Sequence, residues 1–173
     1  IRIQNNKFKK IHSKIKPILK EECVDCEGLL MIPGFINAHT HIGDSVGKDI
    51  SLNNTVDEKI HPIFGAKSKI LKNTSNEILG NFMKNTCHSM LRKGITTFVD
   101  FRESGLNGVE LLKNTLSDIP LRSIILGRMD LYQGDEEIKK NLPFPKTELA
   151  KFSKLLKKCD GIGISGANEN STK

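Results

Sequence analysis

Two histidines separated by a single residue are the clearest chemical feature of this sequence. His39 and His41 lie in the stretch PGFINAHTHIGDS, directly after the continuous apolar run 29–32. We expect that run to enter a buried strand, Pro33-Gly34 to bend the chain, and residues 35–38 to continue as extended chain. Apolar residues followed abruptly by polar ligands are typical of a strand that leaves a core and opens into a site.

The spacing of the two histidines predicts a shared metal ion. In a strand, residues i and i+2 project to the same face. With a rise of about 3.3 Å per residue, the Cα atoms of His39 and His41 would lie roughly 6–7 Å apart with parallel side chains. Neutral histidine is the commonest metal ligand in proteins. The pair can therefore converge on one divalent ion.

The composition is that of an ordinary globular protein. The 173 residues are enough for one domain, 37% of them are hydrophobic, and no run of eighteen apolar residues suggests a membrane span. The first residues, IRIQNNKFKKI, alternate between apolar and polar and do not resemble a signal peptide. We expect a cytoplasmic protein with no membrane partner.

The formal charge of +7 raises the question of nucleic acid. The 27 basic residues are mostly lysines scattered along the chain, and the sequence has no tryptophan and a single tyrosine. Nucleic-acid grooves combine clustered arginine and lysine with aromatic residues that stack on bases. The pattern favours a solvated, lysine-rich surface over a nucleic-acid-binding domain.

The four cysteines give no clear metal or redox site. Cys23 and Cys26 form a CxxC pair, but no second CxxC follows, and Cys87 and Cys159 are isolated. The pair also does not open a helix after a strand, as a thioredoxin-type motif would. We interpret all four as free thiols in a reducing cytosol.

The elements that must position the histidines follow from periodicity. A hairpin is predicted at the start, with a turn at Asn5-Asn6, and a polar stretch over 43–74 contains at most a short helix near 56–60. A long amphipathic helix should begin at the capping box Thr74–Glu77 and end before Gly94. Further elements are expected as a strand at 95–101, a helix at 108–116, a strand at 121–127, a helix at 147–158 and a strand at 161–166.

Strands that alternate with helices indicate parallel βαβ units with right-handed crossovers. Either an open doubly wound sheet or part of a (β/α)8 barrel would fit this order. None of the predicted strand-to-helix turns carries GxGxxG or GxxxxGK, so neither dinucleotide nor P-loop chemistry is indicated.

PGFINAHTH at residues 33–41 resembles the signature of the amidohydrolase superfamily. The neighbouring DCEG at 25–28 and GITTFVDF at 94–101 resemble that family's lead-in and second barrel strand. Within the superfamily, HTHIGDS is most similar to the cytosine-deaminase and chlorohydrolase branch. The resemblance covers nearly the whole chain.

The resemblance implies an α/β fold: the first half of a (β/α)8 TIM-like barrel, about four βα units over 29–173, preceded by part of a β-sandwich element over 1–28. It also implies that His39 and His41 bind a divalent metal, zinc or iron, which activates water for attack on a C–N or C–Cl carbon. No lysine lies in the predicted fourth strand, where binuclear members carry a bridging lysine. A mononuclear, deaminase-like site is therefore expected.

The resemblance leaves the site incomplete. The family's remaining ligands and its proton shuttle come from later strands, whereas this sequence stops at Lys173 after the fourth. A (β/α)8 barrel typically needs about 250 residues. We expect the catalytic residues in the absent C-terminal half, and no hydrolase activity from the 173 residues alone. Candidate substrate-binding residues in this half are Asp44, His61, Arg102 and Glu103, each of which could equally be a solvated or structural loop residue.

Two hypotheses remain open at this level. The chain is either the N-terminal half of a metal-dependent amidohydrolase acting on a small cyclic amidine or similar molecule, or a non-catalytic half-barrel that serves as an assembly or binding module. A sheet of four strands would leave an open edge and an apolar inner face. We expect a second copy or the missing C-terminal half to cover it, through residues such as Phe98, Ile124 and Ile162.

Overall fold

The computed structural model describes residues 1–50, 53–61, 65–130, 133–164, 166 and 171, without the side chains of Asp57 and Asp135. It divides into two compact units, residues 1–33 and residues 34–173. The predicted domain boundary, between residues 28 and 29, lies five residues before this division.

Residues 1–33 contain a hairpin of β1 (Arg2–Gln4) and β2 (Lys7–Lys10), paired antiparallel. Asn5 and Asn6 have φ of 51° and 58°, the left-handed conformation that a tight two-residue turn requires and that asparagine tolerates well. The hairpin and its turn were predicted from the sequence. That the hairpin belongs to a β-sandwich stays a prediction.

The predicted buried strand at residues 29–32 is wrong. These residues form neither helix nor strand, and Leu30 is 87% exposed. An apolar run becomes a buried strand only where neighbouring strands or helices cover it, and no residue from 1 to 33 is buried. The strand that carries the histidines begins later, at Phe35, where Phe35 N–H donates to Gly94 O at 2.8 Å.

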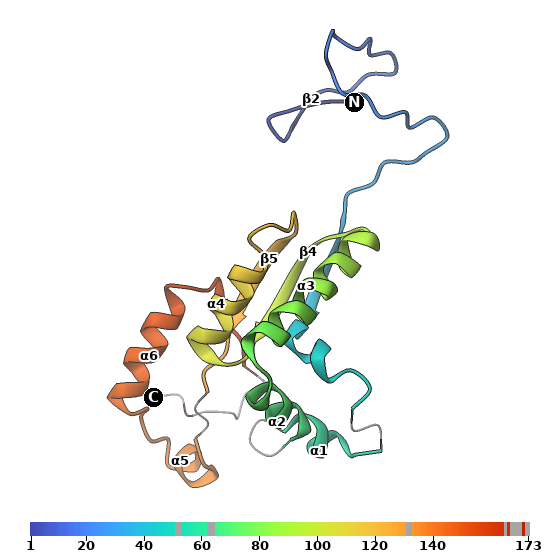
Figure 1. Ribbon diagram of the computed structural model, residues 1–173. Coiled ribbons are helices and arrows are strands. Elements are labelled where there is room, and N and C mark those ends of the chain that lie inside the picture. Colours follow the sequence, from blue (N-terminus) through green and yellow to red (C-terminus); the bar gives the residue numbers. More distant parts are fainter. Residues whose placement is uncertain (51–52, 62–64, 131–132, 165, 167–170, 172–173) are drawn as a thin grey trace. The chain divides into compact units, whose positions relative to one another are not determined.

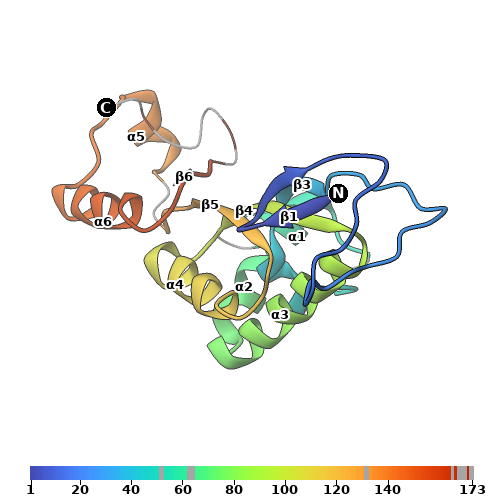
Figure 2. The same ribbon diagram turned by 90° about the horizontal axis from the view of Figure 1, so that it is seen from above.

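Residues 34–173 form a parallel sheet with helices on one face. The strands β3 (Phe35–Thr40), β4 (Ile95–Arg102), β5 (Arg122–Gly127) and β6 (Gly161–Ile162) lie in that order. Each neighbouring pair is parallel. Figures 1 and 2 both place α3 and α4 on the same face of β4 and β5. This is the βαβ arrangement that the sequence predicted, and it fits part of a TIM-like barrel.

The helices differ from the prediction at their boundaries. The helices of the described residues are η1 (Ile42–Gly47, a 3-10 helix), α1 (Val56–Ile60), α2 (Ala66–Asn73), α3 (Asn76–Arg92), α4 (Gly105–Thr115), α5 (Asp135–Lys139) and α6 (Lys146–Leu156). The prediction missed η1, α2 and α5, because a polar composition hid their short apolar faces. It also made the last strand too long: β6 has two residues, and Ser165 lies outside the described residues.

Helix α3 shows why a cap can be misassigned by one residue. Ser75, not Thr74, is the N-cap, and its side chain accepts a hydrogen bond from Ile78 N–H. Thr74 instead ends α2, and its hydroxyl donates to Ile70 O at 2.7 Å. At the other end, Gly94 takes φ of 77° and donates to Leu91 O, the C′ arrangement that the sequence predicted.

The core lies between the sheet and the helices. Its buried members from the long helix are Leu79, Met83, Cys87 and Met90, which pack with Phe98, Val109, Leu112 and Ile125. Phe98 is completely buried, so the expectation that it lies on an open inner face is wrong. Ile124, on the opposite side of the sheet, is 38% exposed.

None of the helices in the described part of the chain is both long and apolar enough to cross a membrane.

Candidate active site

The histidine pair lies at the carboxyl end of β3, where the strand passes into η1. Asn37 pairs with Phe98 and Thr40 with Asp100, so one extra residue is inserted into β3 between the two positions. Such a bulge re-aims the side chains that follow it. The Asn37 side chain accepts a weak hydrogen bond of 3.4 Å from His39 N–H within the bulge.

His39 and His41 converge, as the sequence predicted. Their Nε2 atoms lie 3.3 Å apart. Two nitrogen ligands on one tetrahedral zinc ion, with bonds of roughly 2.0–2.1 Å, would be about 3.3–3.4 Å apart. The His39 ring also stacks on Phe101, with ring centroids 4.5 Å apart, and this contact fixes its plane. The pair therefore has the separation that a shared metal ion requires.

Glu103, directly after β4, holds the other side of the His41 ring. Its Oε1 accepts a hydrogen bond from His41 Nδ1 at 2.9 Å. Because an ionised carboxylate can only accept, we infer that Nδ1 carries the proton, which leaves Nε2, facing His39, as the nitrogen that could bind a metal. A carboxylate on the far nitrogen of a metal-binding histidine is the usual arrangement around metal sites.

Two cations keep Glu103 ionised. Lys67 Nζ, from α2, lies 2.5 Å from Glu103 Oε1, and Arg102 Nη2 lies 3.0 Å from Glu103 Oε2. Burial by itself would raise the pKa of Glu103, but the His41 hydrogen bond and the charges of Lys67 and Arg102 outweigh it, so the pKa lies well below its usual range. Both carboxylate oxygens of Glu103 are therefore occupied by partners within the protein.

Arg102 lies behind the site. Its side chain is 4% exposed, and its guanidinium contacts Glu103, Met83 Sδ at 3.5 Å and Asp100 Oδ2 at 3.8 Å. A Cβ at residue 43 would come within 2.4 Å of that guanidinium, so Gly43 is needed for this close approach. The prediction that Arg102 binds substrate does not fit this burial.

Asp100 ties β4 to the start of η1 beneath the histidines. It is fully buried, and its Oδ1 accepts hydrogen bonds from Ile42 N–H at 2.7 Å and from the Thr40 hydroxyl at 2.9 Å. Burial raises the pKa of Asp100 despite the Arg102 charge. These bonds fix the backbone on both sides of His41, so the orientation of the ring depends on a residue sixty positions away.

Lys67 pairs with two of the four predicted substrate-binding residues, Asp44 and Glu103, and lines a cavity with a third, His61. Lys67 Nζ also lies 2.9 Å from Asp44 Oδ2, and burial raises the pKa of Asp44 more than the Lys67 charge lowers it. His61 and Glu103 both line a cavity of about 310 Å³ together with Lys67. Asp44 lines a second cavity, of about 150 Å³, which also includes Lys67.

Sequence reasoning missed Lys67 and Asp100. Lys67 lies in a stretch interpreted as loop, although the spacing of Ala66, Ile70 and Leu71 is helical and could have revealed α2. Asp100 was visible as the one acidic residue inside the apolar strand ITTFVDF, and a charge in such a position calls for a buried partner.

The described residues hold no group of three or more histidine, cysteine or acidic side chains that could bind a metal by themselves. The donor set nonetheless fits half of a site: two imidazoles whose Nε2 atoms face each other at ligand spacing, one of them supported by a carboxylate. A catalytic zinc site normally has three protein ligands. Any further ligand would have to come from outside this set.

The parallel α/β sheet and the HxH pair at the end of β3 agree with the class of enzyme that the sequence resembles. The chain belongs to the amidohydrolase family, whose family model matches residues 30–168.

Two relatives are similar to this chain over most of its length. The chain is 39% identical over 152 residues to an uncharacterized protein of Methanocaldococcus jannaschii and 34% identical over 149 residues to a putative aminohydrolase of Methanothermobacter thermautotrophicus. The two matches include 87% and 86% of this chain, but 36% and 37% of the lengths of the relatives. The chain thus spans little more than a third of the length of these relatives.

A more distant relative carries a specific name. The chain is 32% identical over 162 residues, 90% of its length and 35% of the relative's, to a 5-methylthioadenosine/S-adenosylhomocysteine deaminase of Thermococcus sibiricus. Among solved structures, a triazine hydrolase from Arthobacter aurescens matches with a TM-score of 0.54 over 80% of this chain and 32% of that one. At 14% identity this likeness concerns the fold alone.

Proposed function

We propose that this chain is the N-terminal part of a metal-dependent amidohydrolase that hydrolyses a C–N bond in a cyclic amidine or similar small molecule, as a deaminase does. The observation that carries the proposal is the 3.3 Å separation of the His39 and His41 Nε2 atoms at the carboxyl end of β3. The active sites of (β/α)8 enzymes lie at that end of the strands. The deaminase named among the relatives supports the reaction class.

The metal would be one zinc or iron ion held by His39 and His41. Such an ion supplies Lewis acidity and activates water at neutral pH. Glu103 keeps the His41 proton on Nδ1, and Lys67 and Arg102 keep Glu103 charged so that it can do so. We therefore assign Glu103 and Arg102 a positioning role, and we retain Asp44 and His61 as the residues that contact substrate.

Metal binding by the chain itself tests the first step. Cobalt(II) titrated into the purified 173-residue chain should bind weakly, with changes in visible absorption, since two protein ligands are present. The double variant His39→Ala, His41→Ala should lose this binding, whereas His88→Ala, on the exposed side of α3, should retain it. Equal cobalt binding by all three proteins would overturn the proposal.

A measurement of catalytic activity is the second test of the proposal. We expect the 173-residue chain alone to release no ammonia from cytosine or 5-methylthioadenosine, because a catalytic zinc site needs a third protein ligand. Co-expression with the C-terminal two thirds of the Methanocaldococcus jannaschii relative should supply the missing strands. Deamination by the complemented pair that disappears in His41→Ala would support the proposal; turnover by the chain alone would contradict the expected inactivity.

The alternative, a non-catalytic assembly module, is favoured by one observation. Ile124, on the sheet face opposite α3 and α4, is 38% exposed although it lies in a central strand. We expect a second copy or the C-terminal half to cover this face. Sedimentation velocity should show self-association that Ile124→Asp weakens and Phe82→Asp, on exposed helix surface, leaves unchanged. A monomer at micromolar concentration would speak against the second copy.

A further inference from the structure

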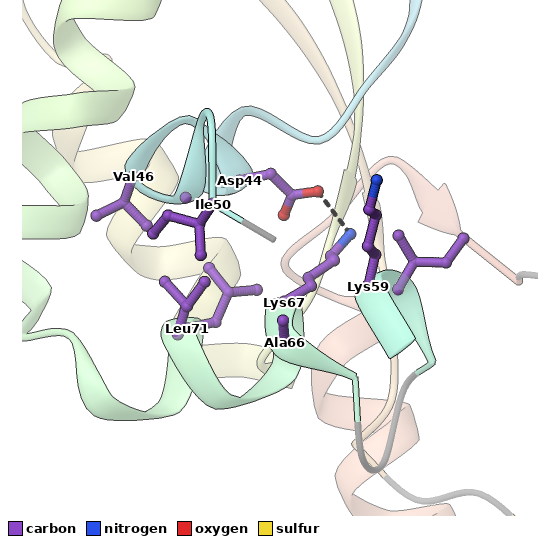
Figure 3. A pocket seen from close by; sticks show the side chains of 10 residues that line it. Asp44, Val46, Ile50, Lys59, Ala66, Lys67 and Leu71 are labelled. Carbon is purple, nitrogen blue, oxygen red and sulfur yellow. Dashed lines mark ion pairs between the residues drawn. The ribbon is translucent and has the colours of Figure 1, made fainter. Parts of the chain in front are cut away.

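The cavity of about 150 Å³ between η1 and α2 has a polar end and an apolar body. Its charged lining residues are Asp44, Lys59 and Lys67, and the ion pair between Asp44 and Lys67 is the dashed line in Figure 3. The apolar side chains that line the rest are Val46, Ile50, Ile60, Ala66, Ile70 and Leu71. A cavity of about this volume with an apolar lining holds a benzene-sized ring.

One atom in this cavity lacks a partner. Asp44 Oδ2 pairs with Lys67, but Asp44 Oδ1 is buried and accepts no hydrogen bond from the described residues. A buried carboxylate oxygen without a donor is unfavourable, and native proteins rarely leave one so. A bound molecule that carries a hydrogen-bond donor would satisfy this oxygen.

The cavity is also connected to the histidine pair. Lys67, Ile60 and Leu71 line both this cavity and the larger one that contains Glu103 and His61. Lys67 itself contacts Glu103, the residue that holds His41. Lys67 Nζ also lies 3.3 Å from His41 Nδ1, the ring nitrogen opposite Nε2, so Lys67 connects the cavity to the supporting side of the His41 ring.

We propose that this cavity is a specificity subsite for a six-membered ring or a similarly compact apolar group that carries one hydrogen-bond donor, a hydroxyl or an amino group, which Asp44 Oδ1 accepts. The proposal rests on the amidohydrolase function insofar as the group belongs to the substrate. The apolar lining residues contact the apolar part of the bound group, and Asp44 accepts the hydrogen bond from its donor. Lys67 holds Asp44 in place through their ion pair.

Phenol and anisole share the ring and differ in the hydroxyl donor and in one methyl group, and the Asp44→Ala variant separates the effect of the donor from that of the added size. In methyl NMR spectra of the metal-free chain, phenol should shift the signals of Ile50, Ile70 and Leu71. Anisole, whose oxygen cannot donate, should bind at least tenfold more weakly. Equal binding of the two would overturn the role of Asp44, and no shift of these methyls at millimolar phenol would overturn the subsite and leave an ordered water as the partner of Oδ1.

Two variants and a control separate the parts of the proposal. Ala66→Leu should fill the cavity and abolish phenol binding, whereas Lys69→Leu, which adds the same side chain on the exposed side of α2, should not. Asp44→Ala should remove the preference for phenol over anisole. Retained phenol binding in Ala66→Leu, or a retained preference in Asp44→Ala, would overturn the assignment; the comparison of the two probes on the unaltered chain stands even if a variant fails to fold.

The metal-free readout keeps this test apart from that of the proposed function. If the double variant of His39 and His41 loses cobalt binding but the unaltered chain binds no phenol, the proposed function stands and the subsite is refuted. If the unaltered chain binds phenol but no cobalt, the subsite stands and the proposed metal site is refuted.

Discussion

Residues 1–33 and residues 34–173 contain apolar side chains in similar patterns but use them differently. In the first unit no residue is buried, and Leu19 is 90% exposed. In the second, Phe98, Val109 and Leu112 are completely buried between a parallel sheet and its helices. The difference shows that an apolar pattern produces a core only where elements on both sides can cover it.

The same contrast appears in the charged residues. The first unit has an ion pair between Arg2 and Glu21, at 2.6 Å and partly exposed to solvent. The second has the Glu103 network, in which Arg102 is 4% and Glu103 14% exposed. Exposed pairs contribute little to stability, whereas removing one partner of a buried network leaves other charges uncompensated. Mutations can therefore compare the two units both in their apolar packing and in their ion pairs.

The largest effect should come from the core. Leu112→Ala should lower the free energy of unfolding by about 2–5 kcal/mol, because it removes buried methyl groups and leaves a cavity. Leu30→Ala, at an 87% exposed position, should change it by less than about 0.5 kcal/mol. Urea denaturation followed by circular dichroism measures both. A comparable loss in Leu30→Ala would mean that residues 29–32 are covered in the protein.

Next in size is the charged network. Glu103→Gln should lower the free energy of unfolding by about 3 kcal/mol, since Lys67 and Arg102 lose their shared carboxylate in a buried setting. Glu21→Gln in the exposed pair should leave the urea midpoint nearly unchanged, because solvent screens this pair. The urea concentrations at the midpoints of unfolding, compared at the same dependence of the unfolding free energy on urea, measure both effects. If the two substitutions cost the same, the Glu103 network is no more structural than the exposed pair.

Cys87 provides a pH-dependent test within the core. Burial and the Asp100 charge raise the pKa of its thiol from 9.0 to about 11. The folded protein therefore keeps a proton that the unfolded chain loses, so stability falls as pH rises across this range, by up to about 3 kcal/mol at pH 11.

A matched variant isolates this effect from the titration of lysines. Cys87→Ala should lower stability at pH 8 through lost packing, but its stability should fall less steeply than that of the unaltered protein between pH 9 and pH 11. Thermal unfolding at four or five pH values provides the comparison. Parallel curves for the two proteins would contradict a raised thiol pKa.

The smallest effect concerns one hydrogen bond at the start of α3. Ser75→Ala should cost about 1 kcal/mol because it removes the N-cap acceptor of Ile78 N–H. Thr74→Ala should cost less, since the Thr74 hydroxyl only donates to a carbonyl at the end of α2. The order of the two unfolding midpoints decides which residue is the cap. A larger loss in Thr74→Ala would support the cap predicted from the sequence.

The sequence by itself determined the strand–helix alternation and the convergence of His39 and His41. Both depend on local rules: periodicity places apolar faces, and i, i+2 spacing at the end of a strand places two side chains together. Asn5-Asn6 and Gly94 were predictable for the same reason, because each turn conformation depends on the residue that adopts it.

Only the tertiary structure decided which residues support those histidines. Lys67, Asp100 and Glu103 reach His41 or its backbone from α2, from β4 and from the residue after β4, across 26 to 62 positions of sequence. The physical reason is that hydrogen bonds and ion pairs act over a few ångströms in space, and chain spacing does not specify which distant side chains come that close. Burial also depends on the tertiary structure. Leu30 and Leu112 are the same residue type, but Leu30 is exposed and Leu112 is buried because only Leu112 has helices and strands packed around it.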